Sequence, residues 1–368
     1  MDLKRGELKI MKYALIGCGR ISPNHVVAAK NSGLDIVAMV DIERKNVEDK
    51  IIKFDLKEDK INIYTDYKEM LEKEKPELVA IATESGKHAP IALDCLDYSC
   101  NLIIEKPIAL SIEEANSIII KGREKGVKVC ACHQNRFNKS IVEIRKAVEK
   151  NRFGKLLYGT AHVRWTRDHE YYDRASWRGT WEQDGGALMN QCIHDIDLLR
   201  WMMGDDIDFV YGMTDRLLHP YIEAEDLGLA IVKFKNGSYG IIEGTTDVFP
   251  RNLEETLYIF GEKGTVKAGG EAVNIIEEWK FSDYFGDEER VKRECAENPP
   301  NVYGFGHTKL YKNVIGAIEG TEQLVADAEA GKKALELVLA IYKSAAEGVP
   351  VKLPLENCST MDFFGRFH

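Results

Sequence analysis

A glycine-rich segment close to the amino terminus has residues that could bind the phosphates of a dinucleotide. Residues 17–22 read G-C-G-R-I-S, a G-x-G-x-x-S pattern, and they directly follow the apolar run 13–16, which we expect to be a strand. Ser22 would be the N-cap of the next helix, with Pro23 at its first position. Glycines here let the backbone approach a pyrophosphate, and the helix N-terminus offers unpaired N–H groups. The alternative to a dinucleotide site is a strand, a turn and a helix that bind no ligand. We expect the dinucleotide site to include Gly17, Gly19, Arg20 and Ile21.

Asp41 ends the next predicted strand, about 20 residues after the glycines, where such a site usually has a carboxylate. This carboxylate can accept a hydrogen bond from the ribose 2′-hydroxyl of NAD, and it would repel the 2′-phosphate of NADP. The sequence therefore favours NAD as the cofactor. Arg44 follows three residues later and could weaken that preference, so the choice stays open.

Polar residues follow two further predicted strands, at 78–82 and 102–104. Ligands of parallel sheets bind beyond the carboxyl ends of the strands. Lys106 is of special interest, because it leaves a buried strand at this edge and is followed by Pro107, whereas most lysines are solvated surface groups. We expect Thr83, Glu84, His88, Glu105 and Lys106 to contact the cofactor.

The stretch 161–201 is dense in arginine and tryptophan, which bind anions and sugars. It continues into a predicted helix, 187–203, on which Asn190 and His194 are four residues apart on one face and Asp197 follows. Two interpretations of His194 are equally open, a core histidine bonded to Asp197 or a general base facing the cleft. A metal site is less favoured because the sequence shows no third ligand. The arginines at 164, 167 and 178 suggest a local positive pocket, although a surface ion pair is the alternative for each.

The elements that must position these residues fall into two groups. In the first third of the chain, short apolar runs alternate with helical patterns, which predicts a doubly wound parallel sheet of the Rossmann type. Beyond residue 133 strands come in neighbouring pairs, and Asn236-Gly237 predicts a type I′ hairpin. We therefore expect an α/β protein with an NAD-binding domain at 1–133. A substrate-binding and oligomerisation domain at 134–368 would be α+β, with a large open mixed or antiparallel sheet and a last helix at about 325–347.

The composition excludes several classes of protein. The chain has 368 residues with 50 basic and 60 acidic side chains, a net charge of −10, which argues against nucleic acid as a partner. Its eight cysteines form no C-x-x-C pair, so we expect structural thiols, no bound metal and a reducing compartment. No signal peptide and no apolar run of membrane-spanning length is visible. The sequence thus predicts a cytoplasmic protein without a membrane partner.

Together, the G-x-G-x-x-S segment, the Glu105-Lys106-Pro107 motif and a G-G-A-L-x-N-x-x-x-H-x-x-D helix at 185–197 resemble the Gfo/Idh/MocA oxidoreductase family, over nearly the whole chain. The resemblance implies that Lys106 lies between nicotinamide and substrate and that His194 accepts the proton. It also implies that Gln134, Trp177 and Arg178 line the nicotinamide. Contacts on the open sheet would give a homodimer or homotetramer.

A narrower resemblance concerns the substrate. Asn190-Gln191, the W-R-G-T-W segment 177–181 and the Y-G-F-G-H segment 303–307 are similar to UDP-N-acetyl-2-amino-2-deoxyglucuronate 3-dehydrogenases. These enzymes oxidise the sugar C3 hydroxyl for bacterial surface polysaccharides such as lipopolysaccharide, and some use 2-oxoglutarate as a second oxidant. Other branches have Asp in place of Asn190, so acid–base work would fall to His194 and Lys106. The implied substrate contacts are Lys106, Arg164, Arg167, Asn190, Gln191, His194, Tyr303 and His307.

Two rival functions remain. One is an inositol or free-sugar dehydrogenase of the same fold. The other is a non-catalytic NAD-binding sensor, against which the presence of both Lys106 and His194 argues. The proposed chemistry needs a base within reach of the hydroxyl and a cation near its oxygen, and these two residue types supply them.

Overall fold

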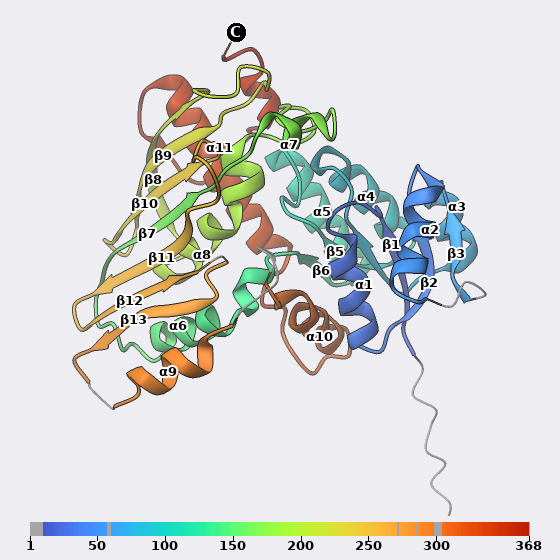
Figure 1. The fold of residues 1–368 in the computed structure, drawn as a ribbon, viewed down its shortest axis with the longest axis horizontal. Helices are drawn as coiled ribbons and strands as arrows, with labels where there is room; N and C mark the ends of the chain where they lie inside the picture. Colours follow the sequence, from blue (N-terminus) through green and yellow to red (C-terminus); the bar gives the residue numbers. More distant parts are fainter. Residues whose placement is uncertain (1–9, 57–59, 271, 284–285, 298–303, 368) are drawn as a thin grey trace, which may run out of the picture.

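The computed structural model describes residues 10–56, 60–270, 272–283, 286–297 and 304–367, which form two sheets with their helices (Figure 1). The first sheet has six parallel strands in the order β3-β2-β1-β4-β5-β6. Its strands are β1 Lys12–Ile16, β2 Asp35–Val40, β3 Asn62–Tyr64, β4 Leu78–Ile81, β5 Asn101–Ile104 and β6 Val129–Ala131. The chain reverses direction across the sheet between β1 and β4, and ligands of such sheets bind beside that point. The predicted Rossmann sheet is confirmed.

Helices cover both faces of this sheet. They are α1 Ser22–Asn31, α2 Arg44–Lys53, α3 Tyr67–Glu74, α4 His88–Asp97 and α5 Ile112–Lys125, with a short 3-10 turn at Ser85–Lys87. In α5 the Ser111 hydroxyl accepts from the Glu114 N–H at 3.1 Å, and Gly126 ends the helix with a φ of 67°. Local signals of this kind fix where a helix begins and ends.

The predicted role of Ser22 as an N-cap is wrong. Ile21 occupies the cap position of α1 without a side-chain hydrogen bond, and Ser22 is the first helical residue. Its hydroxyl instead donates to the carbonyl of Gly19 at 2.7 Å. Ser22 therefore stabilises the glycine loop itself rather than the helix end.

The second sheet has eight strands in the order β13-β12-β11-β7-β10-β9-β8-β14. Among its described neighbouring pairs only β7 and β10 run parallel, so the predicted mixed sheet is confirmed. The strands are β7 Leu156–Arg164, β8 Ile207–Asp215, β9 Leu227–Phe234, β10 Tyr239–Thr245, β11 Glu254–Gly261, β12 Gly264–Gly269, β13 Ile275–Phe281 and β14 Val351–Lys352. The accompanying helices are α6 Lys139–Glu149, α7 His169–Asp173, α8 Ile193–Met203, α9 Glu288–Cys295, α10 Gly306–Ile318 and α11 Ala328–Glu347. Short helical turns cover Gln134–Phe137, Leu188–Cys192 and Thr360–Phe363.

The hairpin between β9 and β10 is confirmed, but its turn is not type I′. Of the two central residues only Gly237 has a positive φ, of 92°, and its N–H donates to the Phe234 carbonyl at 3.0 Å. The loop thus has three residues with glycine at the left-handed position. The Asn236 side chain explains the difference, because it donates to the Met203 carbonyl at 2.7 Å and so fastens the turn to the end of α8.

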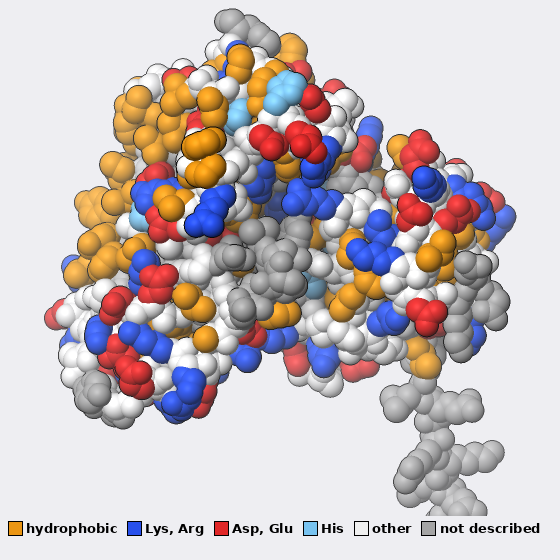
Figure 2. Space-filling view, in the orientation of Figure 1, with side chains coloured by type: hydrophobic (Ala, Val, Ile, Leu, Met, Phe, Trp, Pro, Cys, Tyr) orange, Lys and Arg blue, Asp and Glu red, His pale blue; other side chains and the backbone are white. Residues whose placement is uncertain are grey.

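One face of the second sheet is covered by α8 and α11, and the other is open. Alternate residues on β8, β9 and β10 are exposed and apolar, as the alternation of side chains along a strand requires. They include Tyr211, Met213, Leu229, Ile231, Tyr239 and Ile241. Figure 2 shows hydrophobic side chains gathered on this side of the molecule.

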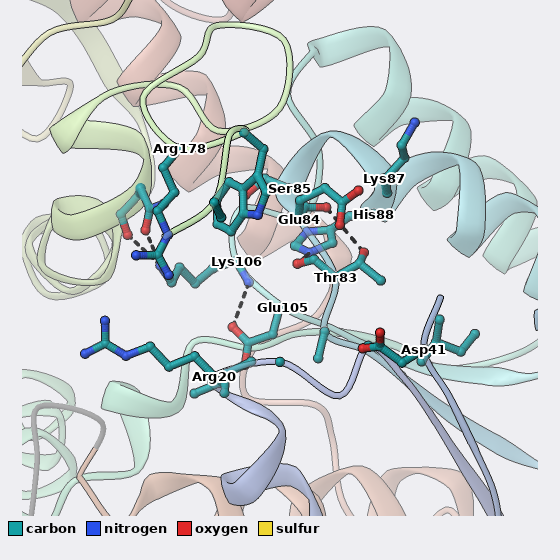
Figure 3. A pocket seen from close by; sticks show the side chains of 18 of the residues that line it. Arg20, Asp41, Thr83, Glu84, Ser85, Lys87, His88, Glu105, Lys106 and Arg178 are labelled. Atoms are coloured by element: carbon teal, nitrogen blue, oxygen red, sulfur yellow. Dashed lines mark hydrogen bonds between the residues drawn. The ribbon is translucent and has the colours of Figure 1, made fainter. Parts of the chain in front are cut away.

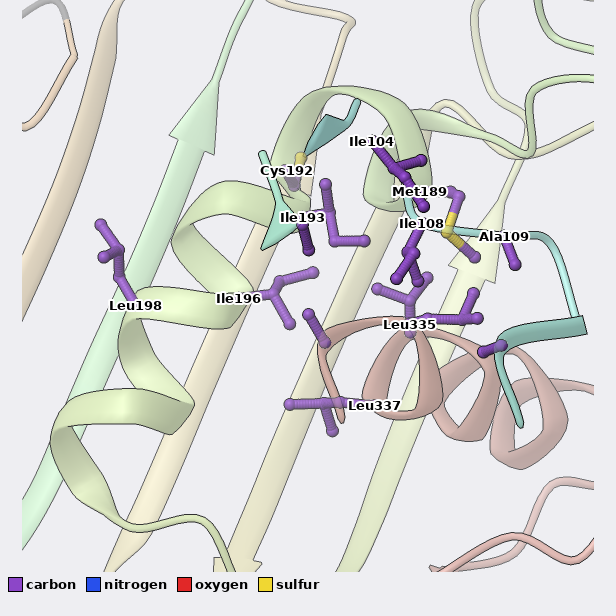
Figure 4. Packing of buried hydrophobic residues seen from close by; sticks show 14 of the residues in the cluster. Ile104, Ile108, Ala109, Met189, Cys192, Ile193, Ile196, Leu198, Leu335 and Leu337 are labelled. Carbon is purple, nitrogen blue, oxygen red and sulfur yellow. The ribbon is translucent and has the colours of Figure 1, made fainter. Parts of the chain in front are cut away.

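A shared core joins the two halves. Helix α11 packs against α5 beside the first sheet and against α8 on the second, and Figure 4 shows Leu335 and Leu337 of α11 close to Ile193 and Ile196 of α8. Helix α10, far along the chain, packs against α1. The domain boundary near residue 133 therefore stays a prediction.

All eight cysteines are buried and form no disulfide. Among the described residues, no helix has the length and apolar character that a membrane crossing needs.

Candidate active site

A cavity of about 840 Å³ lies between the two sheets, and both halves of the chain contribute residues to its wall (Figure 3). This is the size of cavity that binds cofactors and small substrates. The following predicted site residues line it: Gly17, Gly19, Arg20, Ile21, Asp41, Thr83, Glu84, His88, Glu105, Lys106, Gln134, Arg167, Trp177, Arg178, Asn190, Gln191 and His194.

The glycine loop fits a dinucleotide. Gly17 has a φ of +93°, and a Cβ there would lie 2.5 Å from the carbonyl oxygen of Ala82, so only glycine fits. A Cβ on Gly19 would meet nothing within 4 Å, which leaves this backbone open to a ligand. These are the two properties that a pyrophosphate-binding loop requires.

Asp41 is held in place by three donors. Its carboxylate accepts from the backbone N–H of Cys18 at 2.8 Å, from that of Glu43 at 2.9 Å and from the Asn46 amide at 3.0 Å. The side chain therefore stays at the cavity wall as a fixed acceptor, which suits a ribose hydroxyl.

The loops after β4 and β5 are bonded to each other through His88. Its ring nitrogens lie 2.7 Å from the Pro107 carbonyl and 3.1 Å from the Thr83 carbonyl. Burial lowers the pKa of His88, although both carbonyl contacts act in the opposite direction. The ring thus fixes the position of the loop that carries Lys106.

Glu105 is buried between two histidines. The Nε2 atom of His25 lies 2.9 Å from its Oε1 atom, and that of His307 lies 3.7 Å from the same oxygen. Burial alone would raise the pKa of Glu105, but contacts with the two histidines hold it well below its ordinary value. The prediction that His307 binds substrate is contradicted, because this side chain lies behind Glu105 and is not part of the cavity wall.

Lys106 reaches across the cavity to the second half of the chain. Its Nζ atom donates to the backbone carbonyl of Asn190 at 2.5 Å and lies 3.3 Å from that residue's Oδ1 atom. Burial lowers the pKa of Lys106, while the carboxylates of Glu105 and Asp184 act in the opposite direction.

His194 faces the cavity and is not bonded to Asp197. The segment Leu188–Cys192 forms a π-helical turn before α8, and turns of this kind are frequent at functional sites. The His194 Nε2 atom lies 3.3 Å from the Gln134 amide nitrogen, and Nδ1 has no hydrogen-bond partner among the described residues. Burial, with Lys106 and His133 nearby, holds the pKa of His194 well below its ordinary value. The ring is therefore neutral at neutral pH and able to accept a proton.

Asp197 instead anchors the helix. Two nitrogens of Arg136 donate to its carboxylate at 2.7 Å each, and Arg200 donates at 3.0 Å. Burial would raise the pKa of Asp197, but Arg136, His133 and Arg200 hold it well below its ordinary value. Of the two interpretations of His194, the core histidine bonded to Asp197 is wrong.

Two of the three predicted arginines lie in the cavity wall, grouped around Tyr171. Arg167 donates to the Gln191 side chain at 2.8 Å, and Gln191 donates to the Tyr171 hydroxyl at 2.9 Å. The guanidinium carbon of Arg178 is 4.1 Å from the centre of the Tyr171 ring, and that of Arg167 is 4.9 Å from it. Within the described part of the chain, neither guanidinium lies within ion-pair distance of a carboxylate.

Arg164 does not belong to this group, which contradicts the prediction. It bonds to Glu243 at 2.6 Å and also pairs with Glu254, on strands β10 and β11. Strand alternation decides this, because Val163 is buried against the helices and Arg164 therefore lies on the opposite face of the sheet. Its charge is neutralised there and is not offered to a ligand.

Three residues in or next to the cavity wall were not predicted from the sequence: Asp184, Tyr171 and Glu255. Tyr171 and Glu255 line the cavity, and Asp184 bonds to Asn190. Tyr171 is close to the arginines in sequence, which could have signalled it, but nothing in the spacing of Asp184 or Glu255 does so. Tyr303, a predicted substrate contact, lies outside the described residues.

Among the described residues, two clusters have ligand atoms close enough together to hold a metal ion. They are His25, Glu105, Cys132 and His307, and His219, Asp226 and Asp247. In the first, the Tyr311 hydroxyl lies 2.7 Å from Nδ1 of His25, whose other nitrogen already bonds to Glu105. In the second, Asp226 accepts three backbone N–H groups at 2.7 to 2.9 Å. Hydrogen bonds thus account for the central groups of both clusters.

Comparison with known proteins identifies the family. Residues 11–133 match the model described as "Oxidoreductase family, NAD-binding Rossmann fold", and residues 145–353 match "Oxidoreductase family, C-terminal alpha/beta domain". The WlbA dehydrogenase from Bordetella pertussis, solved in complex with NADH and UDP-GlcNAcA, is 36% identical with a TM-score of 0.87, over 94% of this chain and 99% of that one. The WlbA dehydrogenase from Chromobacterium violaceum, solved with the same two ligands, is 33% identical with a TM-score of 0.86, over 95% of this chain and 97% of that one.

A curated relative has a different substrate in its name. The myo-inositol 2-dehydrogenase of Thermotoga maritima is 25% identical over 349 residues, which is 93% of this chain and 98% of that protein. Both domain models give the same family, and the NAD-binding model and the two WlbA complexes with NADH agree on the cofactor. The chain therefore belongs to the Gfo/Idh/MocA oxidoreductase family and is an NAD-dependent sugar dehydrogenase.

Proposed function

We propose that the protein oxidises the C3 hydroxyl of UDP-N-acetyl-2-amino-2-deoxyglucuronate to the 3-keto sugar. The observation that carries this proposal is the pair of guanidinium groups, Arg167 and Arg178, that open onto the same cavity as Lys106 and His194. Both side chains are half-buried and lack a carboxylate partner among the described residues, so a ligand that supplies the anion would stabilise them. In a chain of net charge −10, this local excess of positive charge favours a substrate with a carboxylate and a diphosphate.

The wall residues divide into those for the cofactor and those for the sugar. Gly17, Gly19, Arg20 and Asp41 would hold NAD, which supplies the hydride acceptor when bound. His194, neutral at working pH, accepts the proton of the hydroxyl that is oxidised. Lys106 donates a hydrogen bond to the same oxygen and stabilises the negative charge that develops there. Asn190 and Gln191 line the same cavity, and we assign them to the sugar.

The neighbouring activities fit the wall less well. An inositol is uncharged, so it would leave Arg167 and Arg178 without an anion, although the Thermotoga relative shows that the family includes such enzymes. A non-catalytic sensor has no need of a half-buried lysine beside a neutral histidine. We infer further that copies associate through the open apolar face of β8, β9 and β10 as a dimer or tetramer. Surface-polysaccharide synthesis, with 2-oxoglutarate as a second oxidant, is the cellular role that this activity suggests.

Turnover of a substrate panel tests the proposal. NADH formation is measured with the UDP-linked sugar acid and with myo-inositol, and we expect a preference of at least about 100-fold in kcat/KM for the first. Lys106→Met should fold and bind NAD while it loses turnover. A preference for myo-inositol would refute the substrate, and absence of NADH with every sugar would favour the sensor.

A matched pair of arginine variants tests whether the guanidinium groups in the cavity wall bind the substrate. Arg167→Met should raise KM for the UDP-linked substrate by about 10- to 100-fold, the usual effect of losing a charged hydrogen bond. Arg164→Met should change KM by less than about twofold, because that side chain pairs with carboxylates outside the cavity. Equal effects of the two substitutions on KM would contradict the assignment.

A further inference from the structure

A buried aspartate that none of the recognised motifs contains lies directly behind Asn190. Asp184 is 3% exposed, and its Oδ2 atom accepts from the backbone N–H of Gly179 at 2.7 Å. Its other carboxylate oxygen accepts from the amide nitrogen of Asn190. Among the described residues, no lysine, arginine or histidine forms an ion pair with this carboxylate. The strongest polar partner of Asp184 within the site is therefore the Asn190 side chain.

The chemistry of the two groups fixes the orientation of the amide. An ionised carboxylate only accepts hydrogen bonds, whereas an asparagine has a donor on one side of its amide and an acceptor on the other. Because Asp184 takes the amide nitrogen of Asn190, the amide oxygen is left on the side of Lys106, 3.3 Å from its Nζ atom. With the amide reversed, an N–H group would face the ammonium and repel it.

We propose that Asp184 is a positioning residue, which orients the Asn190 amide so that its oxygen holds the Lys106 ammonium in place to donate to the substrate oxygen. This inference rests on the role proposed above for Lys106. Asn190 itself carries no negative charge. Asp184 supplies one from behind it, through the hydrogen bond between the two side chains.

The charges of the site agree with this arrangement. Burial raises the pKa of Asp184 to about 6, so the group is ionised at neutral pH. The carboxylate in turn acts to raise the pKa of Lys106, against the effect of burial. Its removal should therefore be visible on Lys106 directly, apart from any effect on turnover.

A reversal of polarity provides the test. In Asp184→Asn the new amide can donate to Asn190 and turn the amide nitrogen of Asn190 toward Lys106. We expect kcat to fall by about 10- to 100-fold, the range for a hydrogen bond to a charged group, with NAD affinity unchanged.

The double variant Asp184→Asn, Asn190→Asp has the same total charge as the wild type. The new carboxylate at position 190 can accept both from the new amide at position 184 and from Lys106. We expect the double variant to regain kcat to within about threefold of the wild type.

A purely structural role for Asp184, such as its bond to Gly179, would not be rescued by a change at position 190. The proposal is therefore overturned if Asp184→Asn keeps the kcat of the wild type, or if the double variant recovers no more activity than the single one.

A second readout does not depend on turnover. The pKa of Lys106 is obtained from the pH dependence of its acetylation, followed by mass spectrometry of the NAD-loaded protein. We expect a lower pKa in Asp184→Asn and recovery in the double variant. If these shifts occur but no UDP-linked sugar is oxidised, the proposed substrate fails and the positioning role stands. If the pKa of Lys106 is the same in all three proteins, the positioning role is refuted.

Should Asp184→Asn not fold, Asn190→Leu tests the same contact from the other side. Leucine has the same branching and the same number of side-chain heavy atoms but no acceptor, so the kcat and the Lys106 pKa should both fall. An unchanged kcat and pKa in Asn190→Leu would overturn the proposal as well.

Discussion

Asp184 and Asp197 are both buried, the first just before the π-helical turn and the second within α8, and yet different charges face them. Asp197 is bonded to two guanidinium groups, and its pKa is held well below the ordinary value. Within the described part of the chain, Asp184 accepts from a backbone N–H and from an amide, and burial raises its pKa to about 6. Burial alone thus says little about the role of a carboxylate. The cationic partners distinguish a group that anchors the fold from one whose field reaches the cavity.

A similar contrast separates the two ends of the segment that runs from the π-helical turn at Leu188–Cys192 to the last turn of α8. One end faces the cavity, and the other is held by ion pairs. The beginning presents Asn190, Gln191 and His194 to the cavity, and Nδ1 of His194 has no partner among the described residues. The end is fastened by Arg136, whose guanidinium also stacks 4.6 Å from the centre of the Trp201 ring. Catalytic groups that lack partners are tolerated at one end because the other end is firmly held.

The largest effect expected at the cavity end is that of His194→Asn. Loss of the base should lower kcat by about 10² to 10⁴, since general-base catalysis contributes that much. The free energy of unfolding should change little, because the contact of His194 with Gln134 is a hydrogen bond between neutral groups. Steady-state NADH formation and urea unfolding of the same preparation measure the two quantities. A variant with the wild-type kcat would remove His194 from the mechanism.

The anchor end should behave in the opposite way. Asp197→Asn leaves Arg136 and Arg200 buried without their shared carboxylate, and breaking a buried pair typically costs about 3–5 kcal/mol. We expect a loss of this size in the free energy of unfolding, measured with urea. If the variant instead unfolds like the wild type but loses kcat, the division of the helix into two ends is wrong.

The two carboxylates should also respond to pH with opposite signs. The pKa of Asp184 is raised from 3.8 to about 6, so the folded state keeps a proton that the unfolded state loses. Its contribution to stability therefore decreases as the pH rises from about 4 to about 6, by roughly 3 kcal/mol for a change in pKa of this size. The pKa of Asp197 is lowered, so its contribution is present above about pH 4 and is lost as the pH falls further.

Urea unfolding of the wild type and Asp184→Asn between pH 4 and 7 measures this difference. We expect the variant to lose less stability than the wild type across the window from about 4 to 6. Parallel curves for the two proteins would show that Asp184 does not titrate there.

The smallest expected effect on the free energy of unfolding concerns the exposed ion pair next to Arg200. Asp205 pairs with the buried Arg200 and, at 3.1 Å, with Lys333, whose side chain is 38% exposed. Exposed ion pairs contribute about 0.2–1 kcal/mol, so Lys333→Ala should lower the free energy of unfolding by less than about 1 kcal/mol. A loss of stability as large as that of Asp197→Asn would mean that the exposed Asp205–Lys333 pair contributes as much as the buried pairs of Asp197.

Much of the fold could be predicted because its signals are local. The alternation of strand and helix patterns indicates the first sheet, and the glycine segment with Asp41 indicates the cavity beside it. The hairpin at Asn236-Gly237 was also visible, but its turn type was not, since the Asn236 side chain bonds to the distant residue Met203.

Parts of the site were hidden because they depend on which faces of the elements meet. The charge of Arg164 is evident in the sequence, but whether β7 presents it to the helices or to the open side depends on packing. His307 meets Glu105 only after α10 packs beside α1. Asp184 carries no signal because its contact with Asn190 depends on how the intervening loop folds.

The π-helical turn at Leu188–Cys192 makes the length of this segment matter as much as its residue types. A π turn holds one residue more than a regular helical turn, so Asn190 and His194 do not have the angular separation of an ordinary helix. Deleting a single residue there would restore a regular helical turn and change the direction in which Asn190 and Gln191 point relative to His194. A homologue could thus keep every side chain of the site and lose the activity through one missing codon.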